Sequence, residues 1–189
     1  CCARPKNSGS QPGFADPIVI GSNTHRFQMG EQLFELGIEA TSILLEPVGR
    51  NTAPPALMAA IIAAEIDPDA LILLLPSDHL IRKEDVFLET VRAAEDAARD
   101  GSLVTFGITP TEPNTGYGYI KVAPGDTSVR AVEKFVEKPD LDRAKAFLED
   151  GSYVWNAGIF LYSADTMITA FKNHQPDLFK AVSEVMETR

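Results

Sequence analysis

Short apolar runs alternate with stretches of helical periodicity along most of the chain. Runs rich in branched apolar residues predict β-strands over 17–21, 42–46, 71–75, 103–108 and 153–163. Apolar positions at helical spacing predict helices over 24–36, 52–66, 83–99, 141–149, 164–173 and 176–187. Two further strands, 117–123 and 129–137, are joined by PGDTS. The first half of the chain therefore alternates strand and helix, and this rhythm changes after residue 110.

The alternation predicts βαβ units and a parallel sheet, because consecutive parallel strands need a crossover helix. The continuous apolar strands agree, since strands of a parallel sheet are covered on both faces. We expect an α/β fold of the Rossmann-like class, with a mostly parallel or mixed sheet and helices on both faces. Residues 17–189 are expected to form one domain, and the polar, Gly-, Pro- and Ser-containing residues 1–16 a disordered or unrelated terminus.

Composition narrows the class of protein. The chain has 189 residues, 44% of them hydrophobic and 23% charged, as in ordinary globular proteins. No apolar run reaches the ~20 residues that span a bilayer, so we expect no membrane segment. The formal net charge of −10 argues against a nucleic-acid surface. The only cysteines, Cys1 and Cys2, are adjacent and offer no metal-binding spacing, so we expect a cytoplasmic protein with incidental thiols.

In open parallel sheets, ligands bind beyond the carboxyl ends of the strands, so residues at those ends are candidates. The strand 42–46 ends at Glu46, and Asn51 or Thr52 then opens the next helix. A carboxylate accepts the neighbouring N1–H and N2–H₂ donors of guanine, whereas adenine and pyrimidines lack such a pair. The alternative is a plain β–α turn with a helix cap.

The strand 71–75 ends in Pro76, Ser77, Asp78 and His79. A carboxylate at this edge suits Mg²⁺ shared with nucleotide phosphates, so Asp78 is a candidate metal ligand. The alternative for Asp78 is the N-cap of the following helix. His79 is interpreted as a supporting or structural residue, as are His25 and His174.

Further candidates precede or follow the later strands. Gly116 and Gly118 allow a backbone to approach a ligand closely, although a tight hairpin entry explains them equally well. Glu137 suits sugar hydroxyls and Lys138 suits a phosphate, with a surface ion pair as the alternative. In 153–163, the amide of Asn156 suits a hydroxyl, whereas Trp155 is expected in the core or in a pocket wall. We expect these residues, Glu46 and Asp78 to lie on one rim of the sheet.

Five motifs in this order resemble those of the sugar nucleotidyltransferases, in particular the mannose-1-phosphate guanylyltransferases. They are EPVGRNTAP, LLPSDH, FGITPTEPNTGYGYI, FVEKPD and WNAGIF, and HRFQMGEQL also resembles an early helix of that family. The resemblance runs from about residue 17 to the end. It implies the nucleotide-diphospho-sugar transferase fold and Mg²⁺-dependent transfer of GMP from GTP to mannose 1-phosphate, with release of pyrophosphate.

The resemblance also implies roles for individual residues. Catalytic roles fall to Asp78, which holds the metal, and to Lys138. The nucleotide is expected at Glu46, Arg50, Asn51, Thr52, Ala53 and Ser77. The sugar phosphate is expected at Tyr117, Gly118, Glu137, Lys138, Asn156 and Gly158.

Two departures from the family pattern stand out. Nothing in the chain resembles the family's Gly-rich phosphate loop, GxGxRLWP, and the chain ends before a second metal-binding Asp. We therefore expect a fold that is incomplete at both ends and a 189-residue chain with little or no activity alone. A strand left without its partner would expose an apolar edge near 17–21, which favours a homo-oligomer.

Two alternatives remain open at this point. One is a nucleotidyltransferase for another pair of nucleotide and sugar phosphate. The other is a non-catalytic paralogue that binds a sugar nucleotide or regulates a partner.

Overall fold

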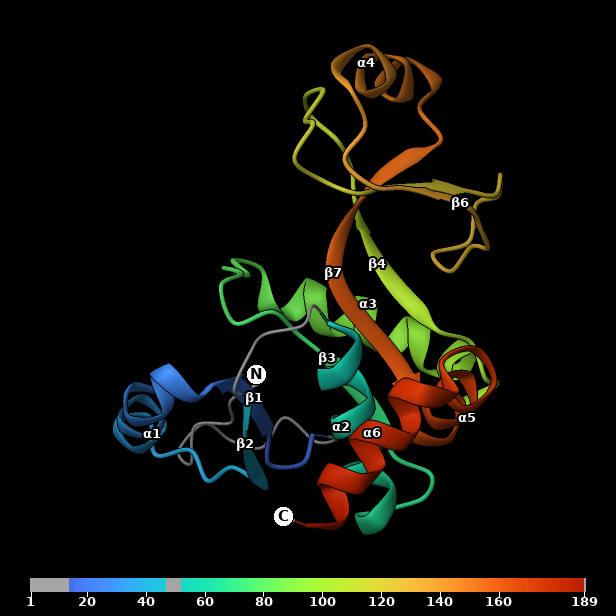
Figure 1. The fold of residues 1–189 in the computed structure, drawn as a ribbon. Helices are drawn as coiled ribbons and strands as arrows, with labels where there is room; N and C mark the ends of the chain where they lie inside the picture. The colour runs from blue at the N-terminus through green and yellow to red at the C-terminus, as the bar shows by residue number, and fades with distance from the viewer. Residues whose placement is uncertain (1–13, 47–51, 189) are drawn as a thin grey trace. The chain divides into compact units, whose positions relative to one another are not determined.

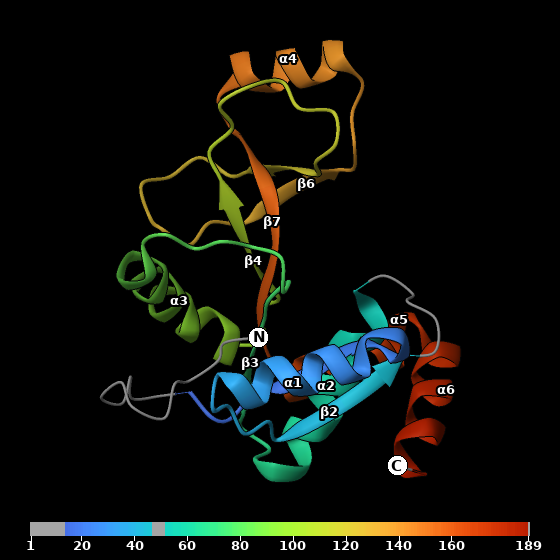
Figure 2. The same ribbon diagram turned by 90° about the vertical axis from the view of Figure 1, so that its left-hand side faces the viewer.

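The computed structural model describes residues 14–46 and 52–188, which form two compact units. The central unit is residues 71–166. The terminal unit, as described, is residues 14–46, 52–70 and 167–188. Figures 1 and 2 show the ribbon from two directions. Helices and strands alternate as predicted, so the α/β class is confirmed.

The terminal unit begins with two parallel strands, β1 (Ile18–Ser22) and β2 (Ser42–Glu46). A short 3₁₀ turn (Asn23–His25) and helix α1 (Arg26–Glu35) connect them. Gly37 ends α1 in the left-handed conformation (φ 63°), and the amide of Ile38 donates to Leu33 O at 2.9 Å. This is a Schellman cap, which glycine favours at this position.

Two helices of the terminal unit pack on each other: α2 (Ala53–Ile66) and α6 (Pro176–Glu187). α2 is rich in Ala and buries several of these small side chains, together with Leu57. Small residues let helix axes approach closely, so this pair supplies core with little side-chain volume. α5 (Ala164–His174) begins in the central unit and continues into the terminal unit.

The central unit is built around one long strand, β7 (Tyr153–Ser163). Its neighbours are β3 (Leu71–Leu74), β4 (Val104–Ile108) and β5 (Tyr119–Val122), all antiparallel to β7. β6 (Val132–Val136) pairs with β5 and starts later than its predicted residue 129. Every described pair in this five-stranded sheet is antiparallel, and among the described residues parallel pairing occurs between β1 and β2. β3 and β4 run in the same direction, but β7 lies between them and they do not pair.

The pairing register shows which strands lie along each edge of β7, the long strand labelled in Figure 1. Leu161 faces both Leu73 of β3 and Val104 of β4, and Trp155 faces both Ile108 of β4 and Tyr119 of β5. One edge of β7 is thus covered by β4, and the other is shared by β3 and β5. An interruption separates β3 from β5 on that shared edge.

Helices α3 (Glu84–Arg99) and α4 (Leu141–Asp150) cover parts of this sheet. α3 buries Val91, Ala94 and Ala98. The ring of Phe147 on α4 stacks on Tyr153 at 4.0 Å and lies 5.3 Å from the fully buried Tyr119. The α4 side of the β5–β7 pair is therefore an aromatic core.

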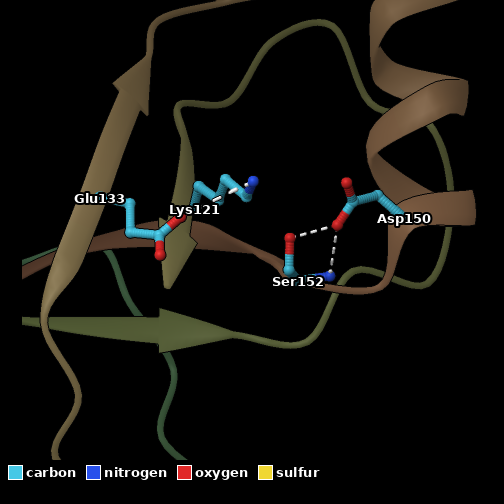
Figure 3. A network of polar contacts seen from close by, with 4 residues as sticks. All are labelled: Lys121, Glu133, Asp150 and Ser152. Atoms are coloured by element: carbon cyan, nitrogen blue, oxygen red, sulfur yellow. Dashed lines mark hydrogen bonds and ion pairs between the residues drawn. The ribbon is translucent and has the colours of Figure 1, made fainter. Parts of the chain in front are cut away.

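Figure 3 shows polar contacts next to this aromatic core. Both the hydroxyl and the amide of Ser152 donate to the Asp150 carboxylate, and Lys121 pairs with Glu133 at 3.6 Å. The Ser152 hydroxyl, followed by its amide, holds the pKa of Asp150 below its usual value. The Asp150–Ser152 contacts fix the turn from α4 into β7, whereas the Lys121–Glu133 pair joins β5 to β6.

Within the described ranges 14–46 and 52–188, no helix has both the length and the apolar character needed to cross a membrane.

Candidate functional site

Three residues form a row across strands β6, β5 and β7. The pairs Tyr119–Val136 and Tyr119–Trp155 end the ladders, and the next position places Gly118 between Glu137 and Asn156. The amide of Asn156 donates to Gly118 O at 2.8 Å, which extends the ladder to this row. Opposed residues of antiparallel strands point to one face, so the side chains of Glu137 and Asn156 share a face. They lie away from Tyr119 and α4.

Gly118 leaves space in the middle of this row. A methyl group here would lie 2.8 Å from Phe135 Cζ and 3.0 Å from Glu137 Oε2. The Glu137 carboxylate therefore lies over the backbone of Gly118, which has no side chain. Two strand spacings separate Glu137 from Asn156, about 10 Å. The row offers a flat floor with a carboxylate at one side and an amide at the other.

Asn156 is held by two donors. Thr105 Oγ1 lies 3.0 Å from Asn156 Oδ1, and the amide of Gly158 donates to the same oxygen at 3.1 Å. Asn156 lies inside β7 and not at a strand end, which differs from the predicted rim of successive ends. A β-bulge lies next to Asn156, because the single residue Phe106 of β4 is opposite residues 157–159 of β7. Such a bulge can redirect a neighbouring side chain.

The bulge coincides with the interruption between β3 and β5. Leu74 of β3 faces Phe160, and Thr105 of β4 faces Phe160 from the other edge. Further along, Ile108 of β4 and Tyr119 of β5 both face Trp155. Ile108 is three positions beyond Thr105 on β4, so the end of β3 and the start of β5 are about 10 Å apart along β7. Pro76 enters this interval: its Cγ lies 3.6 Å from the Cβ position of Gly158, which has φ 68°.

Ser77 and Asp78 follow Pro76 in an exposed turn. α3 begins at Glu84 with Lys83 as its N-cap, so the alternative that Asp78 caps the next helix is wrong. Among the described residues, no hydrogen bond or ion pair engages the Asp78 carboxylate, and no group of three His, Cys, Asp or Glu side chains converges as a metal site. Asp78 fits Mg²⁺ only as a single protein ligand, an arrangement that Mg²⁺ accepts when phosphate and water supply the rest.

The loop before β5 presents Tyr117 and Gly118. The Asn114 amide donates to the buried Tyr119 hydroxyl at 3.0 Å, and Asn114 Oδ1 accepts from the Gly116 amide at 2.8 Å. The Tyr117 ring packs against Trp155 at 5.1 Å in a T-shaped contact. Trp155 therefore packs beneath the loop, which agrees with its predicted place in the core.

Lys138 adopts a backbone conformation that side chains rarely take. It is the non-glycine residue with positive φ (42°) in the described ranges, and its amide donates to Tyr117 O at 3.2 Å. Its Nζ lies 3.6 Å from Glu137 Oε1, with both side chains more than half exposed (64% and 59%). Such an exposed pair contributes little to stability. Strain of this kind is typical of functional sites. Here the side chains of the adjacent residues Glu137 and Lys138 lie close to each other.

Three of the predicted nucleotide residues, Glu46, Thr52 and Ala53, lie in the described part of the terminal unit. Glu46 ends β2 opposite Ser22 and is half-buried. Thr52 is the N-cap of α2 and makes no side-chain capping bond, and the exposed Ala53 opens the helix. Arg50 and Asn51 lie outside the described residues.

Sequence reasoning missed the residues that support the site. Thr105 and Asn114 each hydrogen-bond to a candidate residue, Asn156 and Gly116, and Phe135 lies beside the position that a Cβ of Gly118 would take. Thr105 is 51 positions from Asn156, so no local motif joins them. The available signal is a hydroxyl within an otherwise apolar strand, which needs a buried partner.

The arrangement in the central unit suits a small polyhydroxylated anion. Glu137 accepts hydrogen bonds, Asn156 Nδ2 donates them, and Lys138 supplies a positive charge beside the row. Glu137 and Lys138 follow the end of β6, and Asn156 lies within β7, where Thr105 of β4 holds its side chain.

Comparisons with known proteins agree with this picture. Residues 6–189 match the family described as Nucleotidyl transferase. The chain is 49% identical over 171 residues to xanthan biosynthesis protein XanB of Xanthomonas campestris pv. campestris (strain B100), covering 90% of this chain and 36% of that protein. It is 46% identical over 181 residues to a mannose-1-phosphate guanylyltransferase of Salmonella montevideo, covering 92% and 38%. The chain thus spans little more than a third of these relatives.

Solved structures give the same fold. A protein titled mannose-6-phosphate isomerase from Helicobacter pylori matches with TM-score 0.80 and 31% identity, over 92% of this chain and 66% of that one. A protein titled mannose-1-phosphate geranyltransferase from Thermus thermophilus matches with TM-score 0.76 and 31% identity, over 91% and 49%. The Rossmann-like prediction is confirmed. Since the family match covers nearly the whole sequence, this chain belongs to the nucleotidyl transferase family.

Proposed function

We propose that the protein containing this chain transfers GMP from GTP to mannose 1-phosphate, giving GDP-mannose and pyrophosphate. The observation that carries the proposal is the row of Glu137, Gly118 and Asn156 beside Lys138. The name of the similar Salmonella protein, mannose-1-phosphate guanylyltransferase, supports the same chemistry. Residues 17–189 would form part of the catalytic domain.

In this reaction a phosphate oxygen of mannose 1-phosphate attacks the α-phosphorus of GTP in line. The new P–O bond forms as the bond to pyrophosphate breaks, so no protein nucleophile is needed. The protein contributes positioning and charge neutralisation. Glu137 would accept hydrogen bonds from mannose hydroxyls, Asn156 would donate one, and the Tyr117–Gly118 backbone would lie beneath the sugar. Gly158 would leave room beside it, and Lys138 would face the sugar phosphate.

A divalent metal is consistent with the family, and we propose Mg²⁺ held by Asp78. A bound Mg²⁺ would neutralise phosphate charge during the transfer. Ser77, next to Asp78 in the exposed turn, would contact the nucleotide phosphates. Because Asp78 has no partner among the described residues, its carboxylate is available for this role without breaking an existing bond.

For the base, we propose Glu46 as the carboxylate that binds guanine, with Arg50, Asn51, Thr52 and Ala53 as further nucleotide-binding residues. The amino end of α2 supports this proposal only through the Ala53 N–H, because Thr52 makes no side-chain cap, Pro54 and Pro55 carry no N–H, and the Ala56 amide donates to Thr52 O. A thermal-shift panel of GTP, ATP, UTP and dTTP tests the choice. GTP should stabilise the protein most, and Glu46→Gln should remove its advantage. A larger shift with UTP or dTTP would instead support another nucleotide and sugar pair.

Glu137→Gln in the full-length protein tests the central proposal. Loss of a hydrogen bond to a charged group costs about 1.5–3 kcal/mol, so kcat/KM for mannose 1-phosphate should fall roughly 10- to 150-fold. Glu133→Gln is the matched control, because Glu133 lies on β6 and pairs with Lys121 outside the row. Pyrophosphate release is the readout. No release from wild-type protein with GTP and mannose 1-phosphate would contradict the proposal and favour the non-catalytic alternative.

Cytoplasmic location and homo-oligomerisation stay predictions. Fractionation and light scattering of the purified protein test them.

A further inference from the structure

Thr105 places a hydroxyl inside the sheet of the central unit. Its Oγ1 lies 3.0 Å from Asn156 Oδ1 and 3.4 Å from Ile159 O, in half-buried surroundings. A hydroxyl has one proton to donate, and the shorter contact has the better hydrogen-bond geometry. Thr105 therefore donates to the side chain of Asn156 across the β4–β7 pair.

Gly158 settles which end of the Asn156 amide faces Thr105. A backbone N–H can only donate, so the atom 3.1 Å from Gly158 N must be the amide oxygen. The Gly158 N–H reaches back to the side chain two residues earlier, as in an Asx turn. Two donors thus occupy the lone pairs of one oxygen.

The consequence is that Asn156 meets a ligand through its nitrogen. With Oδ1 satisfied, Nδ2 is the free polar atom of the side chain among the described residues. Glu137, at the other side of Gly118, has only acceptor oxygens when ionised. The floor therefore has a donor on the β7 side and an acceptor on the β6 side.

We propose that Thr105 is a positioning residue that fixes this polarity by holding the Asn156 amide. The inference rests on the proposed function for the identity of the ligand as a sugar phosphate. It adds that the sugar presents a hydroxyl oxygen to Asn156 Nδ2 and a hydroxyl proton to Glu137. If Thr105 no longer holds it, the amide can rotate and present its oxygen to the ligand.

Steady-state kinetics of the full-length protein with GTP and mannose 1-phosphate test this role. Thr105→Val keeps the shape and removes the hydroxyl, so KM for mannose 1-phosphate should rise about 2- to 10-fold, the range of one neutral hydrogen bond. KM for GTP should stay unchanged. Thr105→Ser restores the hydroxyl and should restore KM. Thr90→Val is the matched control, because Thr90 bonds only Val86 O on the exposed side of α3.

A double-mutant cycle separates positioning from general support of the fold. In an Asn156→Ala background, Thr105→Val should have no further effect on KM for mannose 1-phosphate. An equal effect in both backgrounds, or an unchanged KM in the single variant, would overturn the inference. If Thr105→Val does not fold, Thr105→Ala replaces it in the cycle. Wild-type protein that turns over no mannose 1-phosphate would refute the proposed function instead, which keeps the two failures distinct.

Discussion

The two units differ in how firmly they hold the residues assigned to them. In the central unit, β7 pairs with three strands, and Tyr119 and Tyr162 are fully buried. In the terminal unit, α1 buries no side chain, and Phe27 and Phe34 are 77% and 86% exposed. Its sheet has two strands, an arrangement that has little stability by itself.

The difference indicates that the central unit holds its candidate site residues in place more precisely than the terminal unit does. Asn156, Gly118 and Lys138 each have a hydrogen bond to a neighbouring strand or loop. Glu46 ends a two-stranded sheet, and Thr52 starts a helix without a side-chain cap. A sugar held for in-line attack tolerates little displacement, whereas base recognition by one carboxylate tolerates more. Substitutions in each unit test this contrast.

Tyr119→Ala should have the largest effect. It removes a fully buried ring that contacts Phe147 and Trp155, and it leaves the Asn114 amide without its acceptor. Truncation of a large aromatic core residue costs about 3–5 kcal/mol, and urea denaturation followed by circular dichroism should detect it. Tyr119→Phe keeps the ring and should cost about 1 kcal/mol. Equal losses in the two variants would mean that the ring packing is not what holds the loop.

Gly118→Ala should come next, with activity affected more than folding. The added methyl would meet Phe135 and Glu137, whose tips can move, so overpacking should cost about 1–3 kcal/mol. Displacing the Glu137 carboxylate should lower kcat/KM for mannose 1-phosphate about tenfold or more. Gly30→Ala is the matched control, because nothing lies within 4 Å of its Cβ position. It should stabilise α1 by about 0.5–1 kcal/mol and leave activity unchanged.

Tyr162→Phe should change the alkaline limit of stability. Burial raises the pKa of the Tyr162 phenol, so the folded state holds this proton more tightly than the unfolded state does. The resulting stabilisation is complete below the unfolded pKa of about 10 and is lost as the pH rises above it. Urea midpoints at pH 8 to 11 should fall for the wild type and fall less for Tyr162→Phe. Tyr153→Phe, which retains Tyr162, should behave like the wild type.

Phe34→Ser in α1 should have the smallest effect. The ring is 86% exposed, and surface substitutions typically change stability by less than about 0.5 kcal/mol. The same urea titration measures it. A loss comparable to that of Tyr119→Ala would show that α1 is buried against something in solution, and it would remove the contrast between the two units.

The sequence predicted most elements because their periodicity is local. The helix over 52–66 and the strand over 153–163 match α2 and β7 within one residue. The predicted helix over 24–36 ends within one residue of α1, just before Gly37, which has no side chain to limit φ. These features depend on neighbours within a few positions, which a pattern of residues records.

Pairing partners and supporting contacts were not predictable in the same way. The insertion of β7 between β3 and β4 joins Leu71 to Ser163, a separation that no periodicity encodes. The hold of Thr105 on Asn156 depends on that insertion. Glu137 and Lys138 were found because a strand-breaking Pro follows them. The left-handed conformation that brings Lys138 back toward Glu137 is not what Lys favours in sequence.

The late position of β7 in the chain has a consequence for biosynthesis. β3, β4 and β5 leave the ribosome before the strand that pairs with all three of them. Because β7 is synthesised after them, the apolar runs of β3 and β4 have no partner strand until residues 153–163 emerge. During that interval they are exposed to association with other nascent chains, and chaperone demand during translation should peak just before β7 is synthesised.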